Sequence, residues 1–358
     1  MTKLKEHKPS KIEALKAMTP ADRRRAIFDG IMNNAMFIII ALVIIYVAIK
    51  NPRFLSIPSL VNIISLTAAK LPIALGVGGC IILAGTDISA GRQVGLAACI
   101  SAGLQLTTNK LFPGLQILPI PVVLLCVLVA CAMVGFVNGF FMAKFKLHPF
   151  IVTLSTQLIV YGLVLLFMQL GTNGGQTLSG MSEGYRNFII KPLLTLKTSS
   201  GPVTVPRYVL YSTIITAIVW VIWNKTAFGK NMFAVGSNAD AAKVSGVNVF
   251  WTTVMVHTLA GAMYGVTGFI EGARISSITQ SAGLNYECDA IAACVIGGVS
   301  FVGGTGKISG IVLGVFVLRI IFVALSMLGI DPSMQYIIKG GIILAACSLD
   351  MRKYLAKK

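Results

Sequence analysis

Pro119 to Met142 reads PIPVVLLCVLVACAMVGFVNGFFM, 24 residues without a charged side chain. A helix needs about 20 predominantly apolar residues to cross the hydrocarbon core of a bilayer. Of the 358 residues in the chain, 56% are hydrophobic and only 12% are charged, whereas soluble domains carry about 25% charged residues. The chain lacks the charge to cover a water-facing surface, so we expect an integral membrane protein.

Nine further apolar runs are separated by polar residues, glycine or proline. Together with the first run they predict an all-α polytopic membrane protein of about ten transmembrane helices, with broken or re-entrant segments. In chain order the second run, residues 59–84, is long, and we expect it to be broken around Lys70 and Pro72. The eighth run, residues 288–300, is short. The predicted spans are residues 33–49, 59–84, 90–107, 119–142, 149–170, 207–223, 249–270, 288–300, 308–328 and 334–348.

The positions of the basic residues predict that both termini are cytoplasmic. Short cytoplasmic loops of membrane proteins carry an excess of Lys and Arg. Eighteen of the 30 lysines and arginines fall in segments assigned to the inside and eight in outer segments. The other four fall within predicted spans, at Lys70, Arg92, Arg319 and Lys339. Because the net charge of +18 is spread over loops and termini, we do not expect a nucleic-acid partner.

Two basic tails flank the predicted membrane domain. Residues 1–32 are expected to form a cytoplasmic N-terminal tail, residues 33–348 the transmembrane domain, and residues 349–358 a basic cytoplasmic tail. Within the first tail, residues 19–28 suit a short helix capped by Thr19. Its three consecutive arginines would lie near the anionic headgroups of membrane lipid. An ordinary solvated linker is the alternative interpretation.

A polar stretch interrupts the apolar runs at Gly85-Thr86-Asp87-Ile88-Ser89-Ala90-Gly91-Arg92-Gln93. Charged groups at membrane depth are costly and normally face a cavity or a partner. Carboxylate, hydroxyl and amide groups can hydrogen-bond the hydroxyls of a neutral polyol. We therefore predict that this segment lines a substrate route, with candidate residues Thr86, Asp87, Ser89, Arg92 and Gln93. The alternative is an internal Asp87–Arg92 ion pair that only holds helices together.

Neither a nucleotide-binding motif nor a metal site is recognisable in the sequence. The glycine-rich stretch from Gly297 to Gly310 lacks the spacing of a P-loop, because Phe301 stands where the first glycine belongs and Ile308 follows Lys307. The seven cysteines and three histidines show no metal-ligand spacing. We therefore predict no catalytic residues, no ATP hydrolysis by this chain, and no bound metal or cofactor.

Two loops are candidates for contact with other proteins. Gly171–Pro206 is the longest predicted outer loop, and it could partly cover a pore or meet an external partner. The inner loop Asn224–Asn248 contains Ser237-Asn238-Ala239-Asp240, which has capping-box character with the hydroxyl of Ser237 as the cap. Ala241 and Ala242 can continue this helix, and Gly246 can end it. So short a helix is marginal alone, so we expect it to dock on a partner.

Asp240-Ala241-Ala242-x-x-x-Gly246 resembles the EAA loop of the permease subunits of ABC importers, although the usual Glu is Asp here. The stretches Gly85–Gly95, Tyr286–Ala293 and Gly297–Gly310 resemble motifs of the ribose/galactose permease family. The resemblance runs from about residue 30 to residue 347. The motif Ala90-Gly91-Arg92-Gln93 is most similar to the galactose/methyl-galactoside branch of that family.

The resemblance implies a subunit of an ATP-driven importer in the bacterial inner membrane. Its expected partners are a second copy of this chain, a tandem-domain cytoplasmic ATPase that binds ATP and Mg²⁺, and a periplasmic sugar-binding protein. Ser237, Asp240, Ala241, Ala242 and Gly246 would then couple the membrane domain to the ATPase. Glu287 and Asp289 would border the sugar route or hold the structure near the outer end of the eighth span.

The main alternative is a secondary sugar transporter driven by ions. It would need no docking helix, and Asp87 would bind a proton or sodium.

Overall fold

The computed structural model describes residue 19 and residues 44–171, 173–198 and 201–355. The predicted N-terminal tail with its short helix, and most of the first predicted span, lie outside these residues. So do the last three residues of the C-terminal tail.

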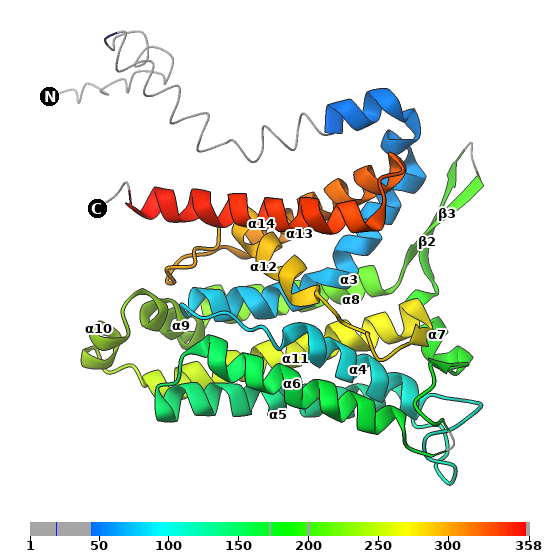
Figure 1. The fold of residues 1–358 in the computed structure, drawn as a ribbon, viewed down its shortest axis with the longest axis horizontal. Helices are drawn as coiled ribbons and strands as arrows, with labels where there is room; N and C mark the ends of the chain where they lie inside the picture. Colours follow the sequence, from blue (N-terminus) through cyan, green and yellow to red (C-terminus); the bar gives the residue numbers. More distant parts are fainter. Residues whose placement is uncertain (1–18, 20–43, 172, 199–200, 356–358) are drawn as a thin grey trace, which may run out of the picture.

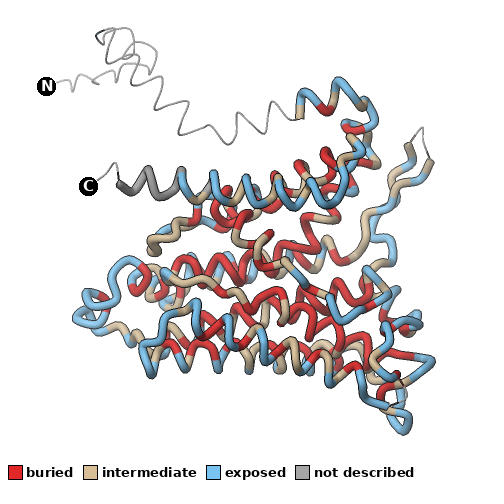
Figure 2. Tube along the Cα trace, viewed as in Figure 1, coloured by how far each residue is buried: buried red, intermediate tan, exposed pale blue. Residues whose placement is uncertain are grey.

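The described chain is mostly helical, and its long helices run side by side (Figure 1). Within the described ranges, six helices are long and apolar enough to cross a membrane. α3 and α11 are the most buried of the six, and they pack against each other in the middle of the bundle (Figure 2). The six are α3 (Ile57–Ile82), α5 (Ile120–Phe145), α6 (Pro149–Met168), α8 (Tyr208–Lys225), α11 (Val249–Ile275) and α13 (Ile308–Met327). The membrane-spanning character of the chain is confirmed, while ten spans stay a prediction.

The predicted break around Lys70 and Pro72 is wrong. α3 is one continuous helix of 26 residues that passes through both positions, and its bounds lie two residues before those of the predicted run. Proline removes one backbone hydrogen bond but need not end a helix that neighbouring helices enclose. The ammonium group of Lys70 is paired with Glu271 of α11, so the charge does not require an interruption.

Two short helices, α4 (Ala90–Leu104) and α12 (Tyr286–Ile296), each follow a non-helical segment that returns into the bundle. Residues 83–89 lead from the end of α3 into α4, and residues 276–285 lead from the end of α11 into α12. The beginnings of the two short helices meet, because a Cβ added to Gly91 would collide with Gly283 and Glu287. The 83–89 segment contains the start of the polar interruption predicted at Gly85–Gln93, whereas the 276–285 segment was not predicted. In both places a long helix is followed by a non-helical segment and then by a short helix.

One end of the bundle, which we call the hairpin end, carries most of the residue 171–206 loop. This loop contains α7 (Glu183–Ile190) and an antiparallel hairpin of β2 (Pro192–Thr198) and β3 (Gly201–Pro206), which projects from the body in Figure 1. A second small sheet pairs β1 (Leu178–Ser179) with β4 (Ser277–Ile278). The described part of the fold is thus mostly helical, with two small two-stranded sheets.

The opposite end, which we call the α10 end, carries α9 (Ala227–Ser237) and α10 (Ala239–Val244). The last helix, α14 (Pro332–Leu355), runs back toward this end, so the end of α14 and α10 lie at the same end of the molecule (Figure 1). The glycine-rich loop between α12 and α13 lies there too, because its residues contact α9. Residues 224–248 and the end of α14 thus lie at one end of the described chain, while their cytoplasmic placement stays a prediction.

Candidate translocation and coupling site

Three of the residues predicted to line a route form a buried hydrogen-bond network. Asp87, Ser89 and Gln93 are fully buried. The hydroxyl of Ser89 donates to Asp87 Oδ1 at 2.5 Å and accepts from Gln93 Nε2 at 2.9 Å. It also accepts from Asn138 Nδ2 at 3.1 Å, and Asn138 Oδ1 accepts from Thr156 at 2.6 Å. The network ties the 83–89 segment to α5 and α6, and it holds the start of α4 in place.

The alternative Asp87–Arg92 ion pair is not formed among the residues that the structure describes. Arg92 points away from Asp87 toward α6 and the 276–285 segment. Its guanidinium group lies 4.2 Å from the centre of the Tyr161 ring, and its Nη1 donates to the carbonyl oxygen of Gln280 at 3.4 Å. Arg92 and Thr86 are partly exposed, whereas the other three candidates are buried.

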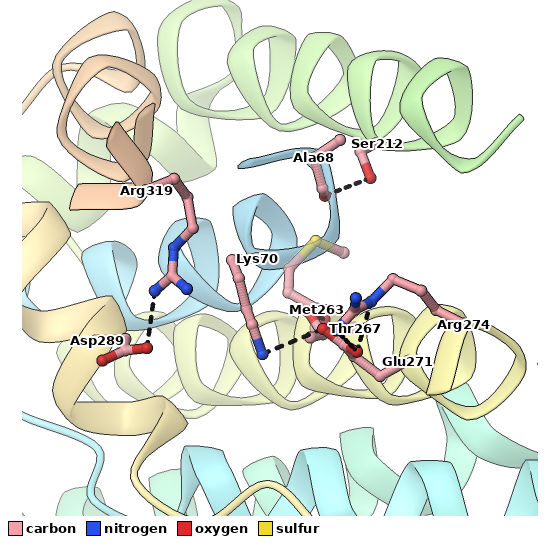
Figure 3. A network of polar contacts seen from close by, with 9 residues as sticks. All are labelled: Ala68, Lys70, Ser212, Met263, Thr267, Glu271, Arg274, Asp289 and Arg319. Carbon is pink, nitrogen blue, oxygen red and sulfur yellow. Dashed lines mark hydrogen bonds and ion pairs between the residues drawn. The ribbon is translucent and has the colours of Figure 1, made fainter. Parts of the chain in front are cut away.

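A second polar cluster lies between α3 and α11 (Figure 3). Glu271 is 1% exposed, and its carboxylate pairs with Lys70 Nζ at 3.1 Å and with Arg274 Nη2 at 2.7 Å. Lys70 Nζ also lies 2.7 Å from the centre of the Tyr286 ring at the start of α12. Charges inside a membrane are normally paired in this way, and the cluster fastens α3, α11 and α12 together.

Asp289 belongs to a third cluster, on α12, α13 and α14. Arg319 Nη2 lies 2.7 Å from Asp289 Oδ2 (Figure 3), and Lys339 Nζ lies 2.6 Å from Asp289 Oδ1. Its two ion pairs suit a role in holding these helices. Glu287, in contrast, packs against Gly91 of α4 where the two short helices begin. No group of three His, Cys, Asp or Glu side chains within the described ranges could hold a metal ion.

The short helix α10 has the predicted end but not the predicted cap. Ser237 is the last residue of α9, and Asn238 caps α10 by accepting from the Ala241 amide at 2.9 Å. Asn238 takes this place because its backbone is extended, as an N-cap requires. Gly246 ends the helix with a φ of +85°, and its amide donates to the Lys243 carbonyl at 3.0 Å. This left-handed ending is the one that glycine favours.

α10 presents both charged and apolar side chains outward. Ala242 is 5% exposed and packs inward, whereas Asp240 and Ala241 are exposed and Val244 is 90% exposed. α10 does not stand alone, because it follows α9 directly and packs against it.

The junction of α9 and α10 touches the ends of two distant segments. The amide of Gly304 donates to the carbonyl oxygen of Ile82 at 2.8 Å, where α3 ends. A Cβ added to Gly236 would collide with the same carbonyl, and one added to Gly304 would lie 2.7 Å from the Cα of Ser237. We call the contact between the backbones of Ile82, Gly236 and Gly304 the glycine junction. It joins the α10 region directly to the 83–89 segment and to the α12–α13 loop.

A cleft of about 1050 Å³ opens at the α10 end beside this junction. Its walls come from α9 and α10, from the turn between α5 and α6, and from the start of α11. Gly85 and His257 also line it, so the cleft leads from the surface near α10 to the beginning of the 83–89 segment.

A protein-family profile described as branched-chain amino acid transport system / permease component matches residues 59–347. The chain belongs to this permease family. The permease is 41% identical over 338 residues to the galactose/methyl galactoside import permease protein MglC of Salmonella typhimurium, covering 94% of this chain and 98% of the relative. It is 42% identical over 334 residues to MglC of Haemophilus influenzae, covering 92% and 97%.

A ribose relative is less similar. The permease is 33% identical over 339 residues to the ribose import permease protein RbsC of Bacillus subtilis, covering 93% of this chain and 97% of the relative. These matches confirm the resemblance to ribose and galactose permeases and the multi-pass membrane character of the chain. No solved structure matches the permease.

Proposed function

We propose that this permease is the membrane subunit of an ATP-driven importer for galactose and methyl galactoside. Relatives that carry this description are 41% and 42% identical over more than nine-tenths of the chain. The similarity to the ribose permease of Bacillus subtilis is lower, at 33%, which favours the galactoside over the pentose. Hydroxyl, amide and carboxylate side chains at the interruptions suit a neutral polyol.

The observation that carries the proposal is α10 with its exposed face. The helix is too short to be stable without support, and Val244 leaves an apolar side chain almost fully in solvent. The glycine junction connects it to the 83–89 segment. A separate ATPase that holds Asp240, Ala241 and Val244 could therefore displace the 83–89 segment and the α12–α13 loop. Ser237, Ala242 and Gly246 would support this contact, since they shape and end the helix without presenting its exposed face.

The topology and partners follow from this assignment. The α10 end and both termini would face the cytoplasm, and the hairpin end would face the periplasm across the bacterial inner membrane. Two copies of the permease, a cytoplasmic ATPase with two linked domains and a periplasmic sugar-binding protein would form the importer. ATP and Mg²⁺ would bind the ATPase, which supplies the hydrolysis.

The sugar route would pass the meeting point of α4 and α12. Thr86 and Arg92 would border it directly, since they are partly exposed. Asp87, Ser89 and Gln93 would position this border from behind. Glu287 would lie beside the route at the start of α12, and Asp289 would keep α12 attached to α13 and α14.

Co-purification of the ATPase tests the proposal. In V244D a charged side chain replaces the exposed valine of α10, and we expect the variant to insert normally but to lose the ATPase. The matched control is L193D, because Leu193 is 48% exposed on the hairpin at the other end; this variant should retain the ATPase. Full ATPase binding by V244D would count against the assigned role of α10.

A further inference from the structure

The segment between α11 and α12 carries an unusual set of side chains. Residues 276–285 read Ser-Ser-Ile-Thr-Gln-Ser-Ala-Gly-Leu-Asn, with six hydroxyl or amide side chains and no charge. The segment lies outside the polar stretch Gly85–Gln93 and the glycine-rich stretch Gly297–Gly310. Its chemistry is that of a surface that hydrogen-bonds neutral hydroxyl groups.

The segment lies deep in the membrane domain. Gly283 packs on Gly91, and Ala282 packs on Gly95. α4 continues from there to Leu104 near the hairpin end, and at about 1.5 Å per residue this places Gly91 about 20 Å below that end. The non-helical chain of residues 276–283 therefore covers roughly the half of the membrane nearer the hairpin end.

The polar side chains of this segment are uncovered. Thr279, Gln280 and Ser281 are all exposed, and the hydroxyls of Thr279 and Ser281 lie 2.9 Å apart. Irregular backbone at membrane depth is tolerated only where protein buries it or where it lines a water-filled cavity. The uncovered face must therefore meet water or another protein, and lipid is excluded.

Further polar groups stand beside this face. The carbonyl oxygen of Gln280 accepts from Arg92 Nη1, and the side chain of Gln280 donates to the Gly175 carbonyl at 3.2 Å. The guanidinium group of Arg92 stacks on the ring of Tyr161. Hydroxyl, amide, guanidinium and phenol groups from α4, α6 and the 276–285 segment thus lie close together. The outer loop holds Gln280 through its bond to Gly175.

We propose that Thr279, Gln280 and Ser281, with Arg92, line a water-filled part of the sugar route and hydrogen-bond the hydroxyls of the passing monosaccharide. The inference rests on the proposed import function and adds the surface that the sugar meets. Neutral donors and acceptors on a string of short side chains exchange partners readily with water, so they can pass a polyol along without retaining it.

Thiol labelling in the assembled importer tests the proposal. S281C is compared with S155C, in which the cysteine lies on the exposed face of α6. The probe is a positively charged, membrane-impermeant methanethiosulfonate reagent, added to both sides of the membrane during turnover, and the wild-type importer gives the background of the native cysteines. A cysteine thiolate, which forms readily only in water, attacks the reagent to form a disulfide and release methanesulfinate, so we expect S281C to react at least about tenfold faster than S155C.

A second measurement ties the labelling to the sugar. Methyl galactoside supplied with its binding protein should slow the labelling of S281C and leave that of S155C unchanged. Equal labelling of the two variants, or labelling of S281C that sugar does not slow, would overturn the proposal. A disulfide between two copies of S281C on oxidation, without labelling, would assign the face to the contact between copies and would also overturn it.

The failure of this inference is distinguishable from the failure of the proposed function. ATP-driven uptake of methyl galactoside by the unmodified importer tests the function, and the contrast between S281C and S155C tests the surface. Normal uptake with equal labelling would leave the function standing and remove the assigned surface.

Discussion

The backbone amide of Gly304 donates a hydrogen bond to the carbonyl oxygen of Ile82, with 2.8 Å between the two atoms. These residues are 222 positions apart in the chain, and the bond closes the end of α3 onto the α12–α13 loop. Gly236 packs on the same carbonyl oxygen. We therefore expect a displacement of α9 and α10 to reach the end of α3 and the α12–α13 loop through these backbone contacts.

The first prediction concerns Gly236. A Cβ at this position would collide with the Ile82 carbonyl, and overpacking of this kind costs about 1–3 kcal/mol. We expect G236A to retain ATPase binding and ATP hydrolysis but to lower sugar uptake by about tenfold or more, which corresponds to about 1.4 kcal/mol. Uptake and hydrolysis are measured on the same proteoliposomes.

G162A is the matched control for Gly236. Gly162 also lies within a helix, but a Cβ there meets no atom within 4 Å, so its uptake should equal that of the wild type. If G236A and G162A transport equally well, the glycine junction does not transmit the movement.

The second prediction concerns Ser89. Its hydroxyl donates a hydrogen bond to Asp87 and accepts hydrogen bonds from Gln93 and Asn138. Removal of one partner from a buried network leaves the others unsatisfied, at about 1–3 kcal/mol for each group. S89A should therefore unfold at a lower temperature than the wild type, as measured in detergent. S155A, which changes an exposed serine on α6, should not. Equal melting temperatures for the two variants would contradict a structural role of the network.

The third prediction compares the two partners of one ion pair. E271Q leaves both Lys70 and Arg274 without their carboxylate, and a buried charge without its partner costs about 3–5 kcal/mol. K70M leaves Glu271 paired with Arg274, so its loss of stability should be clearly smaller. Thermal unfolding and the yield of folded protein measure the difference. A K70M variant as unstable as E271Q would show that Arg274 does not share the carboxylate.

The fourth prediction concerns the end of α10. Gly246 has a φ of +85°, and a Cβ added at this position would meet no atom within 4 Å. Only the backbone conformation therefore restricts which residue can stand here. G246N should retain ATPase binding, since asparagine tolerates the left-handed region. G246P should lose it, because proline fixes φ near −65° and removes the amide that bonds to Lys243. Equal binding by the two variants would contradict the need for this helix ending.

The sequence was sufficient to predict features that depend on local composition. Apolar length predicted the spanning helices, and the glycine at position 246 predicted the end of α10, because a left-handed ending favours that residue. The cap of α10 was assigned one residue early, to Ser237. Ser237 and Asn238 can both cap a helix, and only the extended backbone of Asn238 decides between them.

Features that depend on distant partners could not be predicted. Lys70 suggested a break in α3 because nothing near it in the sequence offers a carboxylate, and its partner Glu271 lies 201 residues away. The polar stretch at 276–285 was overlooked, since serine and threonine are ordinary in outer loops. The proposed role of this stretch depends on how deep it lies in the membrane domain, and the packing of Gly283 on Gly91 shows that depth.

ATP-driven uptake by the reconstituted importer tests the central claim most directly. Methyl galactoside uptake is measured in proteoliposomes that contain the permease with or without its ATPase and the sugar-binding protein. The account predicts accumulation against a gradient only when all three proteins and ATP are present. Accumulation by the permease alone, driven by a proton or sodium gradient, would contradict it.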